Sequence, residues 1–311
     1  MAKHPGSLSI FLLLFFLILI EISPALGALS SQPGIHELFE KGIRSCRKGD
    51  FDEGIRYFNS ILQMEPSHYL AYLNRGIAYK DKNAYDQAIV DFNHCVQLDP
   101  GNAEAYFQLG VVYGNQAKLE EAILQYSIAI IVKPSHPKSF AARAMMHSLN
   151  GGLNSAIDDI NQAISTDPEF PMFYIVRGQF LDEQGDCRAA ISDFEKAMEA
   201  DSEIFNTKGN LAWVLATAPG KDCRDGEKAL KLAKEELSSG ESHEKLKILA
   251  AAYAEVLDFE HAVEFQEKAL EKLKQVKPLH PLDARILGED LKKYLNQLKS
   301  YQNRMPWRQR P

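Results

Sequence analysis

Apolar residues recur at helical spacing from residue 35 to residue 204, and the same pattern returns every 34 residues. In one stretch, Ala88, Phe92 and Cys95 stand at i, i+4 and i+7, which places them on one face of an α-helix. The next two copies of the stretch present the same face, with Ala122, Tyr126 and Ala129, and then Ala156, Ile160 and Ala163. A proline follows each copy, and we expect it to end the helix because it has no backbone N–H.

A second helical stretch precedes each of these, and it carries a small residue at a fixed place. With that residue taken as position 8 of a 34-residue unit, the series runs Gly42, Gly76, Gly110, Ala144 and Gly178. Position 20 of the same unit is Gly54, Ala88, Ala122, Ala156 and Ala190. Position 32 is Pro66, Pro100, Pro134 and Pro168, and then Ser202. Small residues let neighbouring helices approach closely, so each unit is predicted to be a helix–turn–helix pair.

This period and pattern resemble the tetratricopeptide repeat, whose signature combines L-G-x2-Y, A-x3-F and a closing proline. The resemblance implies an all-α, right-handed superhelical solenoid in which each helix pair buries its apolar face only against its neighbours. A last helix, with Leu287, Leu291, Tyr294 and Leu298 on one face and charge on the other, is predicted to cap the stack. The C-terminal third also resembles the endings of secreted bacterial tetratricopeptide proteins, through "NLAWVLATAP" and "LKSYQNRMPWR".

The chain is therefore expected to divide into consecutive segments. In order, these are a leader (1–27), a linker (28–34), five in-phase repeats (35–204), a sixth, divergent repeat with an insertion (205–242), a seventh repeat (243–276), a capping helix (277–303) and a tail (304–311). The insertion reads "TAPGKDCRDGEKA", and it displaces position 20 of the sixth repeat to Ala229.

An uninterrupted apolar run, Ile10 to Ile20, lies near the N-terminus. A membrane-spanning helix needs about 20 apolar residues, so this run is short for a span. Its length, the lysine before it and the Ala25-x-Gly27 ending after it are typical of a secretory signal, with cleavage expected after Gly27. The chain is therefore predicted to be exported, either periplasmic or secreted. The alternative is an uncut segment, residues 8–22, that tethers it to the membrane.

The four cysteines are too sparse for a disulfide scaffold, but their positions differ in meaning. Cys187 and Cys223 fall in the turns of the fifth and sixth repeats. Turns of consecutive repeats are neighbours in a solenoid, so a Cys187–Cys223 disulfide is predicted, and an oxidising compartment would favour it. Cys95 is predicted to be a buried small residue. Cys46 is expected to face the concave surface, where Arg47 could lower its thiol pKa and make it reactive.

The resemblance also implies a concave surface lined by positions 2, 5, 9, 12 and 13 of the first helices. Positions 5 and 9 are unusually apolar in the first three repeats, and an exposed apolar strip of this kind marks a binding surface. We predict a groove that binds an extended or helical partner segment with apolar anchor residues. Its predicted lining is Phe39, Ile43, Leu73, Ile77, Phe107, Val111, Met145 and Ile175. The alternative is that these side chains pack between repeats, or that "ALSSQPG" covers them.

The remaining candidate chemistry is weak, and the sequence predicts no enzyme activity, metal site or cofactor. The motifs HExxH, GxSxG and GxxxxGK[ST] are absent. His94 and Cys95 are adjacent in one helix and point in different directions. The acidic pairs Asp158/Asp159 and Asp182/Glu183 are typical of solvated helix faces. A net charge of −7 disfavours nucleic acid as a partner, and the basic tail "NRMPWRQRP" is expected to be a solvated end.

These observations predict an exported, non-catalytic scaffold that binds a protein or peptide through its concave groove. The rival hypothesis is a membrane-anchored architectural protein whose repeats organise an assembly without a dedicated peptide groove. In that case the membrane is a partner through the uncleaved N-terminal segment. A third hypothesis makes Cys46 a catalytic thiol.

Overall fold

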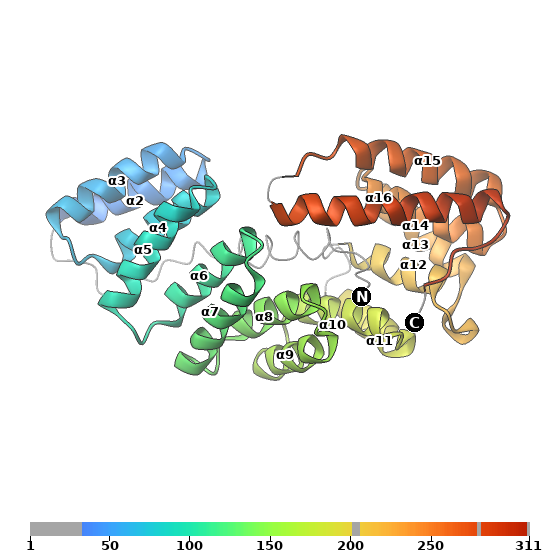
Figure 1. The fold of residues 1–311 in the computed structure, drawn as a ribbon, viewed down its shortest axis with the longest axis horizontal. Helices are drawn as coiled ribbons and strands as arrows, with labels where there is room; N and C mark the ends of the chain where they lie inside the picture. The colour runs from blue at the N-terminus through green and yellow to red at the C-terminus, as the bar shows by residue number, and fades with distance from the viewer. Residues whose placement is uncertain (1–32, 201–205, 279–280, 310–311) are drawn as a thin grey trace. The chain divides into compact units, whose positions relative to one another are not determined.

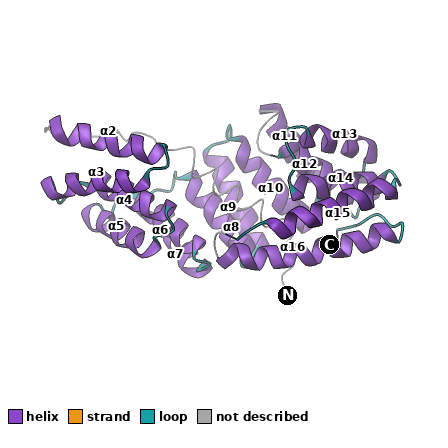
Figure 2. Ribbon diagram, turned by 90° about the horizontal axis from the view of Figure 1, so that it is seen from above, coloured by secondary structure: helices purple, strands orange, loops and turns teal. Residues whose placement is uncertain are grey.

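The structure of the chain, a computed structural model, describes residues 33–200, 206–278 and 281–309 (Figure 1). Within these ranges it contains fifteen α-helices, one short 3₁₀ helix and no strand (Figure 2). The all-α fold predicted from the sequence is therefore confirmed. The chain forms two compact units, and the boundary between them falls between Met146 and His147, inside one helix.

The first unit is a stack of helix pairs in which each helix from α2 to α6 packs against the next one along the chain. The first helices of successive pairs also contact one another, so that α2 packs against α4 and α4 against α6. Its helices are α2 (Pro33–Arg47), α3 (Phe51–Met64), α4 (Tyr69–Asp81), α5 (Tyr85–Leu98), α6 (Ala103–Asn115), α7 (Leu119–Val132) and the boundary helix α8 (Pro137–Leu149).

The second unit continues the pattern and ends on a longer helix. Its helices are α9 (Leu153–Thr166), α10 (Pro171–Gln184), α11 (Cys187–Ala200), α12 (Thr207–Thr217), η1 (Lys221–Cys223), α13 (Gly226–Leu237), α14 (His243–Glu255), α15 (Phe259–Gln275) and α16 (Pro281–Gln302). The last helix, α16, packs against α15. The Tyr294 side chain of α16 is buried in a cluster with Leu246, Ala269, Leu270 and Leu273.

In four helix pairs, a contact between position 8 and position 24 holds the two helices together. A Cβ atom added at Gly76 would lie 2.7 Å from the ring of Phe92. At Gly110 it would lie 2.5 Å from the ring of Tyr126. The same contact joins Gly42 to Phe58 and Gly178 to Phe194. Only glycine lets an aromatic ring lie so close to the helix backbone. In the fourth repeat position 8 is Ala144, and position 24 is the smaller Ile160.

In six of the seven helix pairs, all but the sixth with its insertion, the turn uses one residue with left-handed backbone conformation, at position 15 of the repeat. The residue there has a φ of 82° at Gly49, 83° at Gly151 and 92° at Gly185. Non-glycine residues adopt the same conformation at Asn83, Ala117 and Leu257, with φ of 60°, 62° and 65°. Helix starts are also fixed locally; for example, the Asp50 carboxylate accepts a hydrogen bond from the Glu53 backbone N–H at 3.0 Å.

An arginine at position 7 ties neighbouring repeats together in three places, at Arg75, Arg143 and Arg177. Arg143 Nη1 donates to Ser127 Oγ of the preceding repeat at 2.9 Å. Arg75 donates from Nε and Nη2 to the buried Asp91 carboxylate of its own repeat, at 2.8 and 2.6 Å. Its third nitrogen donates to Asn59 of the preceding repeat. Arg177 makes the same three bonds, to the buried carboxylate of Asp193 and to Asn161. Such bidentate pairs fix geometry as well as adding energy.

Candidate functional site

The N-terminal part of the predicted groove is half-buried. Phe39 and Ile43 of α2 pack on a core cluster formed by Ile35, Phe58, Ile61, Leu62 and Ala71. The Phe39 ring centroid lies 5.8 Å from that of Phe58. Ile77 of α4 is also half-buried, and it packs on the next cluster, to which Leu73 itself belongs. Phe39, Ile43 and Ile77 therefore each keep part of their surface outside the core.

The other predicted groove residues are buried. Phe107 is 3% exposed, and its ring lies 5.7 Å from Tyr126 and 5.5 Å, edge-on, from His136. The remaining side chains with little or no exposed surface are Leu73, Val111, Met145 and Ile175. At these five positions the structure does not show the exposed apolar strip that the sequence predicts. The apolar surface that remains accessible is the smaller one of Phe39, Ile43 and Ile77, which we call the α2–α4 surface.

The acidic pair at the end of α10 is not solvated, contrary to the sequence-based expectation. Asp182 and Glu183 are both half-buried, and this burial raises the pKa of Asp182 to about 6 and that of Glu183 to about 7. The Asp182 carboxylate accepts a hydrogen bond from Gln309 Nε2 at 2.8 Å, which opposes the rise in its pKa. The positive charges of Lys247 and Lys293 likewise favour the ionised forms of Asp182 and Glu183, respectively.

The two residues of the second acidic pair, both on α9, differ in exposure. Asp158 is exposed, as the sequence predicts, whereas Asp159 is buried, and its carboxylate lies 3.9 Å from Nε2 of His147. Position 23 of the repeat, which Asp159 occupies, is the same position that holds Asp91 and Asp193. A carboxylate at this position therefore belongs to the contact between the two helices of a pair.

The two unbonded cysteines are packing residues. Cys95 is buried in the cluster of Ala88 and Phe92, as predicted, and its thiol lies 3.7 Å from the Tyr69 carbonyl oxygen. A Cβ atom at Gly54 would overlap the sulfur of Cys46, so that thiol lies between the helices of the first pair. Burial raises the pKa of Cys46 to about 11. The hypothesis that a neighbouring cation activates this thiol is therefore wrong.

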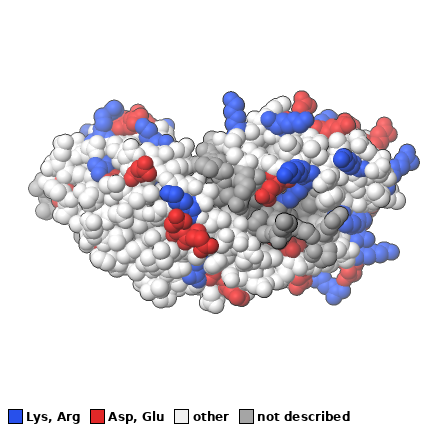
Figure 3. Space-filling view, viewed as in Figure 1, with Lys and Arg blue, Asp and Glu red and all other residues white. Residues whose placement is uncertain are grey.

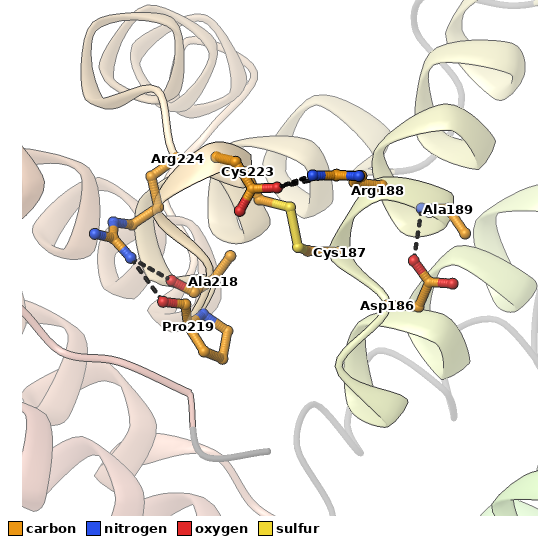
Figure 4. Close-up of a disulfide and its surroundings, with 9 residues drawn as sticks. Asp186, Cys187, Arg188, Ala189, Ala218, Pro219, Cys223 and Arg224 are labelled. Atoms are coloured by element: carbon orange, nitrogen blue, oxygen red, sulfur yellow. Dashed lines mark hydrogen bonds and ion pairs between the residues drawn. A yellow bond between two sulfur atoms is a disulfide. The ribbon is translucent and has the colours of Figure 1, made fainter.

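The predicted Cys187–Cys223 disulfide is present (Figure 4). Cys187 begins α11, Cys223 ends η1, and their Cα atoms are 6.1 Å apart. The adjacent residues reinforce this contact. Arg188 donates from Nε to the Asp222 carboxylate at 2.9 Å, while Arg224 Nη1 donates to the carbonyl oxygens of Ala218 and Pro219 (Figure 4). The insertion of the sixth repeat is thus fastened to the fifth.

The basic tail is fastened as well, so the expectation of a solvated end is wrong. Trp307 packs on a core cluster formed by Ala250, Ala254, Ala262 and Tyr301. Arg308 lies 2.6 Å from the Glu255 carboxylate, whose other oxygen accepts a hydrogen bond from Arg224 Nε at 3.0 Å. The backbone N–H of Gln309 donates to the Thr217 carbonyl oxygen at 3.0 Å.

The described residues also bear on metal binding and on membrane association. In the described part of the chain, no three His, Cys, Asp or Glu side chains are placed so that they could hold a metal ion. No helix within residues 33–200, 206–278 and 281–309 combines the length and apolar character needed to cross a membrane. The apolar run Ile10 to Ile20, on which the prediction of export depends, lies outside the described residues.

Stacked helix pairs of constant length define a helical-repeat protein, and comparison with known families identifies the class. Two tetratricopeptide repeat models match residues 41–94 and 103–134, and a TPR repeat model matches residues 76–117. The tetratricopeptide resemblance that the sequence predicts is confirmed over residues 41–134, which these models match. Members of this family are generally non-catalytic scaffolds for protein–protein interaction.

Solved structures agree with this assignment of the fold. A tetratricopeptide repeat protein from Parabacteroides merdae is 14% identical, with a TM-score of 0.62; the match covers 85% of this chain and 100% of that one. PilF from Pseudomonas aeruginosa is 16% identical, with a TM-score of 0.57, covering 74% of this chain and 97% of that one. Comparison with curated protein sequences yields no significant match.

Proposed function

We propose that the chain is an exported, non-catalytic scaffold that binds a partner protein or peptide through the concave side of its N-terminal repeats. The observation that carries this proposal is the α2–α4 surface: Phe39, Ile43 and Ile77 recur at positions 5 and 9 of consecutive first helices and remain half-buried. Apolar anchors of a partner segment would bury the rest of their surface. The buried Leu73, in the cluster on which Ile77 packs, would then support this surface.

A non-catalytic role agrees with the chemistry of the most plausible nucleophile. With its pKa raised to about 11, the Cys46 thiol remains protonated at neutral pH and is a poor nucleophile. We therefore expect the first repeat to contribute to partner binding and not to covalent catalysis.

Site-specific photocrosslinking tests the proposed surface. A photoreactive residue in place of Ile43 or Ile77 is expected to give a discrete adduct with the partner. The same residue in place of Gln63 is expected to give none. Gln63 is a suitable reference because it is exposed on α3, a second helix. The double substitution Ile43→Glu and Ile77→Glu should reduce adduct formation from neighbouring sites at least about tenfold, since each buried charge opposes docking by more than 1.4 kcal/mol.

Two results would contradict this surface. One is equal crosslinking from positions 43, 77 and 63. The other is unchanged adduct formation in the Ile43→Glu/Ile77→Glu protein, provided that its helical circular dichroism matches that of the Gln63→Glu control. The control adds one negative charge, against two in the double variant, at an exposed position, so it reports the general effect of added charge apart from loss of binding.

Export is supported by the leader and by the disulfide. The run Ile10 to Ile20 with its Ala25-x-Gly27 ending is typical of a cleaved signal, and the Cys187–Cys223 bond suits an oxidising compartment. N-terminal sequencing of the protein recovered from an expressing cell should find Ala28 first. An intact N-terminus in a membrane fraction would instead support the anchored, architectural alternative.

A further inference from the structure

Helix α7 carries two apolar faces, and the core uses one of them. Ala122, Tyr126 and Ala129 are buried inside the repeat. Leu124 and Ile131 are 57% and 76% exposed, and Ile128 stands between them in sequence, so the three share one helix face at i, i+4 and i+7. Of the large apolar side chains that the structure describes as exposed, Ile131 shows the greatest exposed fraction.

This outer face, the α7 stripe of Leu124, Ile128 and Ile131, has no counterpart in most other repeats. The residues equivalent to Leu124 are Arg56, Asp158 and Ser192 in the first, fourth and fifth repeats. The residues equivalent to Ile131 are Gln63, Gln97, Ser165 and Glu199. Only the second repeat shares part of it, with Val90 of α5, which is 56% exposed at the position of Leu124. The stripe is therefore a property of the third repeat and not of the repeat pattern.

Exposed charged residues of opposite sign stand near the two ends of helix α7. Glu121, exposed, lies one helical turn before Leu124, and Lys133, also exposed, directly follows the helix. The other lysine close to the helix, Lys118, stands over the ring of Tyr113 of α6, at 5.8 Å from its centroid. In the view of Figure 3, charged side chains of both signs lie on the surface of the molecule.

We propose that the α7 stripe is a self-association surface, on which α7 of a second copy of this chain packs antiparallel. The arrangement is two-fold symmetric, so one patch serves both copies. Leu124 of one copy then lies against Ile131 of the other, and the two Ile128 side chains meet near the axis. The same register brings Glu121 of each copy close to Lys133 of the other. Antiparallel helices also align their dipoles favourably.

The size of the surface sets the strength of the association. A helix of 14 residues is about 21 Å long, so the paired helices with their immediate neighbours bury an area near the low end of specific interfaces. We expect a reversible dimer with a dissociation constant on the order of micromolar. The surface lies on a second helix, and it is distinct from the α2–α4 surface proposed for the partner.

Sedimentation velocity of the protein, as the expressing cell processes it, tests the association over roughly 1–100 µM. A monomer–dimer equilibrium is expected. Leu124→Glu with Ile131→Glu should shift it to monomer by at least about tenfold in dissociation constant. Ser165→Glu, at the position of Ile131 in the next repeat, adds an exposed charge elsewhere and should leave the equilibrium unchanged.

Charge exchange tests the antiparallel register. Glu121→Lys and Lys133→Glu should each weaken the dimer, because each places like charges at both ends of the stripe. The double variant restores opposite charges between copies and should regain the wild-type constant. A monomer at every concentration would overturn the proposal, as would a dimer that Leu124→Glu/Ile131→Glu leaves intact. A monomer whose stripe crosslinks to a different protein would assign that surface to another partner.

Discussion

A single methyl group decides how closely the two helices of a repeat approach one another. Where position 8 is glycine, position 24 is an aromatic residue whose ring lies against the helix backbone. Where position 8 is alanine, at Ala144, position 24 is Ile160. The two positions compensate in size, so the period of the sequence identifies each of them but only the contact explains why they vary together.

This compensation predicts the outcome of a double-mutant cycle at Gly76 and Phe92. Gly76→Ala alone should lower the free energy of unfolding by about 1–3 kcal/mol, because the new methyl group overlaps the ring. Phe92→Ile alone should cost about 1–2 kcal/mol through lost burial. Combined, they should cost less than the sum by about 1 kcal/mol, since the smaller side chain accepts the methyl and alanine favours the helix.

Urea unfolding followed by circular dichroism measures the cycle. The natural Ala144–Ile160 pair provides the reference, because Ala144→Gly should change stability by only about 0.5–1 kcal/mol. Strict additivity of Gly76→Ala and Phe92→Ile would show that the methyl does not meet the ring.

At the scale of the element, the turns between paired helices differ in backbone strain. Position 15 requires a left-handed backbone, which glycine adopts without strain and which costs an L-residue about 1–2 kcal/mol. Leu257 has a φ of 65° and is 68% exposed, so its side chain gains little from burial in return.

Leu257→Gly should therefore stabilise the second unit by about 0.5–1 kcal/mol, the relief of strain exceeding the entropy that glycine adds to the unfolded chain. The matched substitution Gly151→Ala, at a φ of 83°, should destabilise by about 1 kcal/mol. Melting curves of the two variants, recorded side by side, test both signs. A lower melting temperature for Leu257→Gly would mean that the exposed leucine makes contacts of its own.

The insertion between α12 and α13 has its own restraint. The Cys187–Cys223 bond closes a loop of 36 residues, and the chain-entropy model gives it about 3–4 kcal/mol. Cys187→Ser with Cys223→Ser should lower the free energy of unfolding by that amount, measured in urea without reductant. Dithiothreitol should lower the stability of the wild type similarly and leave the double variant unaffected. A wild type that is indifferent to the reductant would show that the bond contributes nothing.

Over the whole molecule, the sequence predicts the contacts that follow from the 34-residue period, and it fails at contacts that depend on side-chain pairing or on how far the helices approach. The helix pairs follow from the fixed spacing of small and apolar residues, and the disulfide follows from neighbouring turns. Whether Phe107 or Val111 is covered depends on how far neighbouring helices approach, and the period contains no such information. The hydrogen bonds from Arg75 to Asp91 and from Arg177 to Asp193 were also missed, because each joins residues 16 apart and occurs in only some repeats.

The tail shows why the sequence-based expectation failed at this end of the chain. A stretch such as "NRMPWRQRP" is polar and lacks helical periodicity, so composition alone favours a solvated end. Its partners, Thr217, Glu255 and Asp182, are distant in sequence and belong to three different helices. Pattern reasoning within a window of one repeat cannot bring them together.

The tail also sets the order in which the second unit can be completed during synthesis. The bond from Gln309 to Asp182 spans 127 residues, and a ribosome releases the later partner long after the earlier one. Until then the Glu255 carboxylate is paired with Arg224 but not with Arg308. The site of Trp307 on the cluster of Ala250 and Tyr301 stays empty. A chain that lacked residues 304–309 would therefore leave this apolar site of the second unit unfilled.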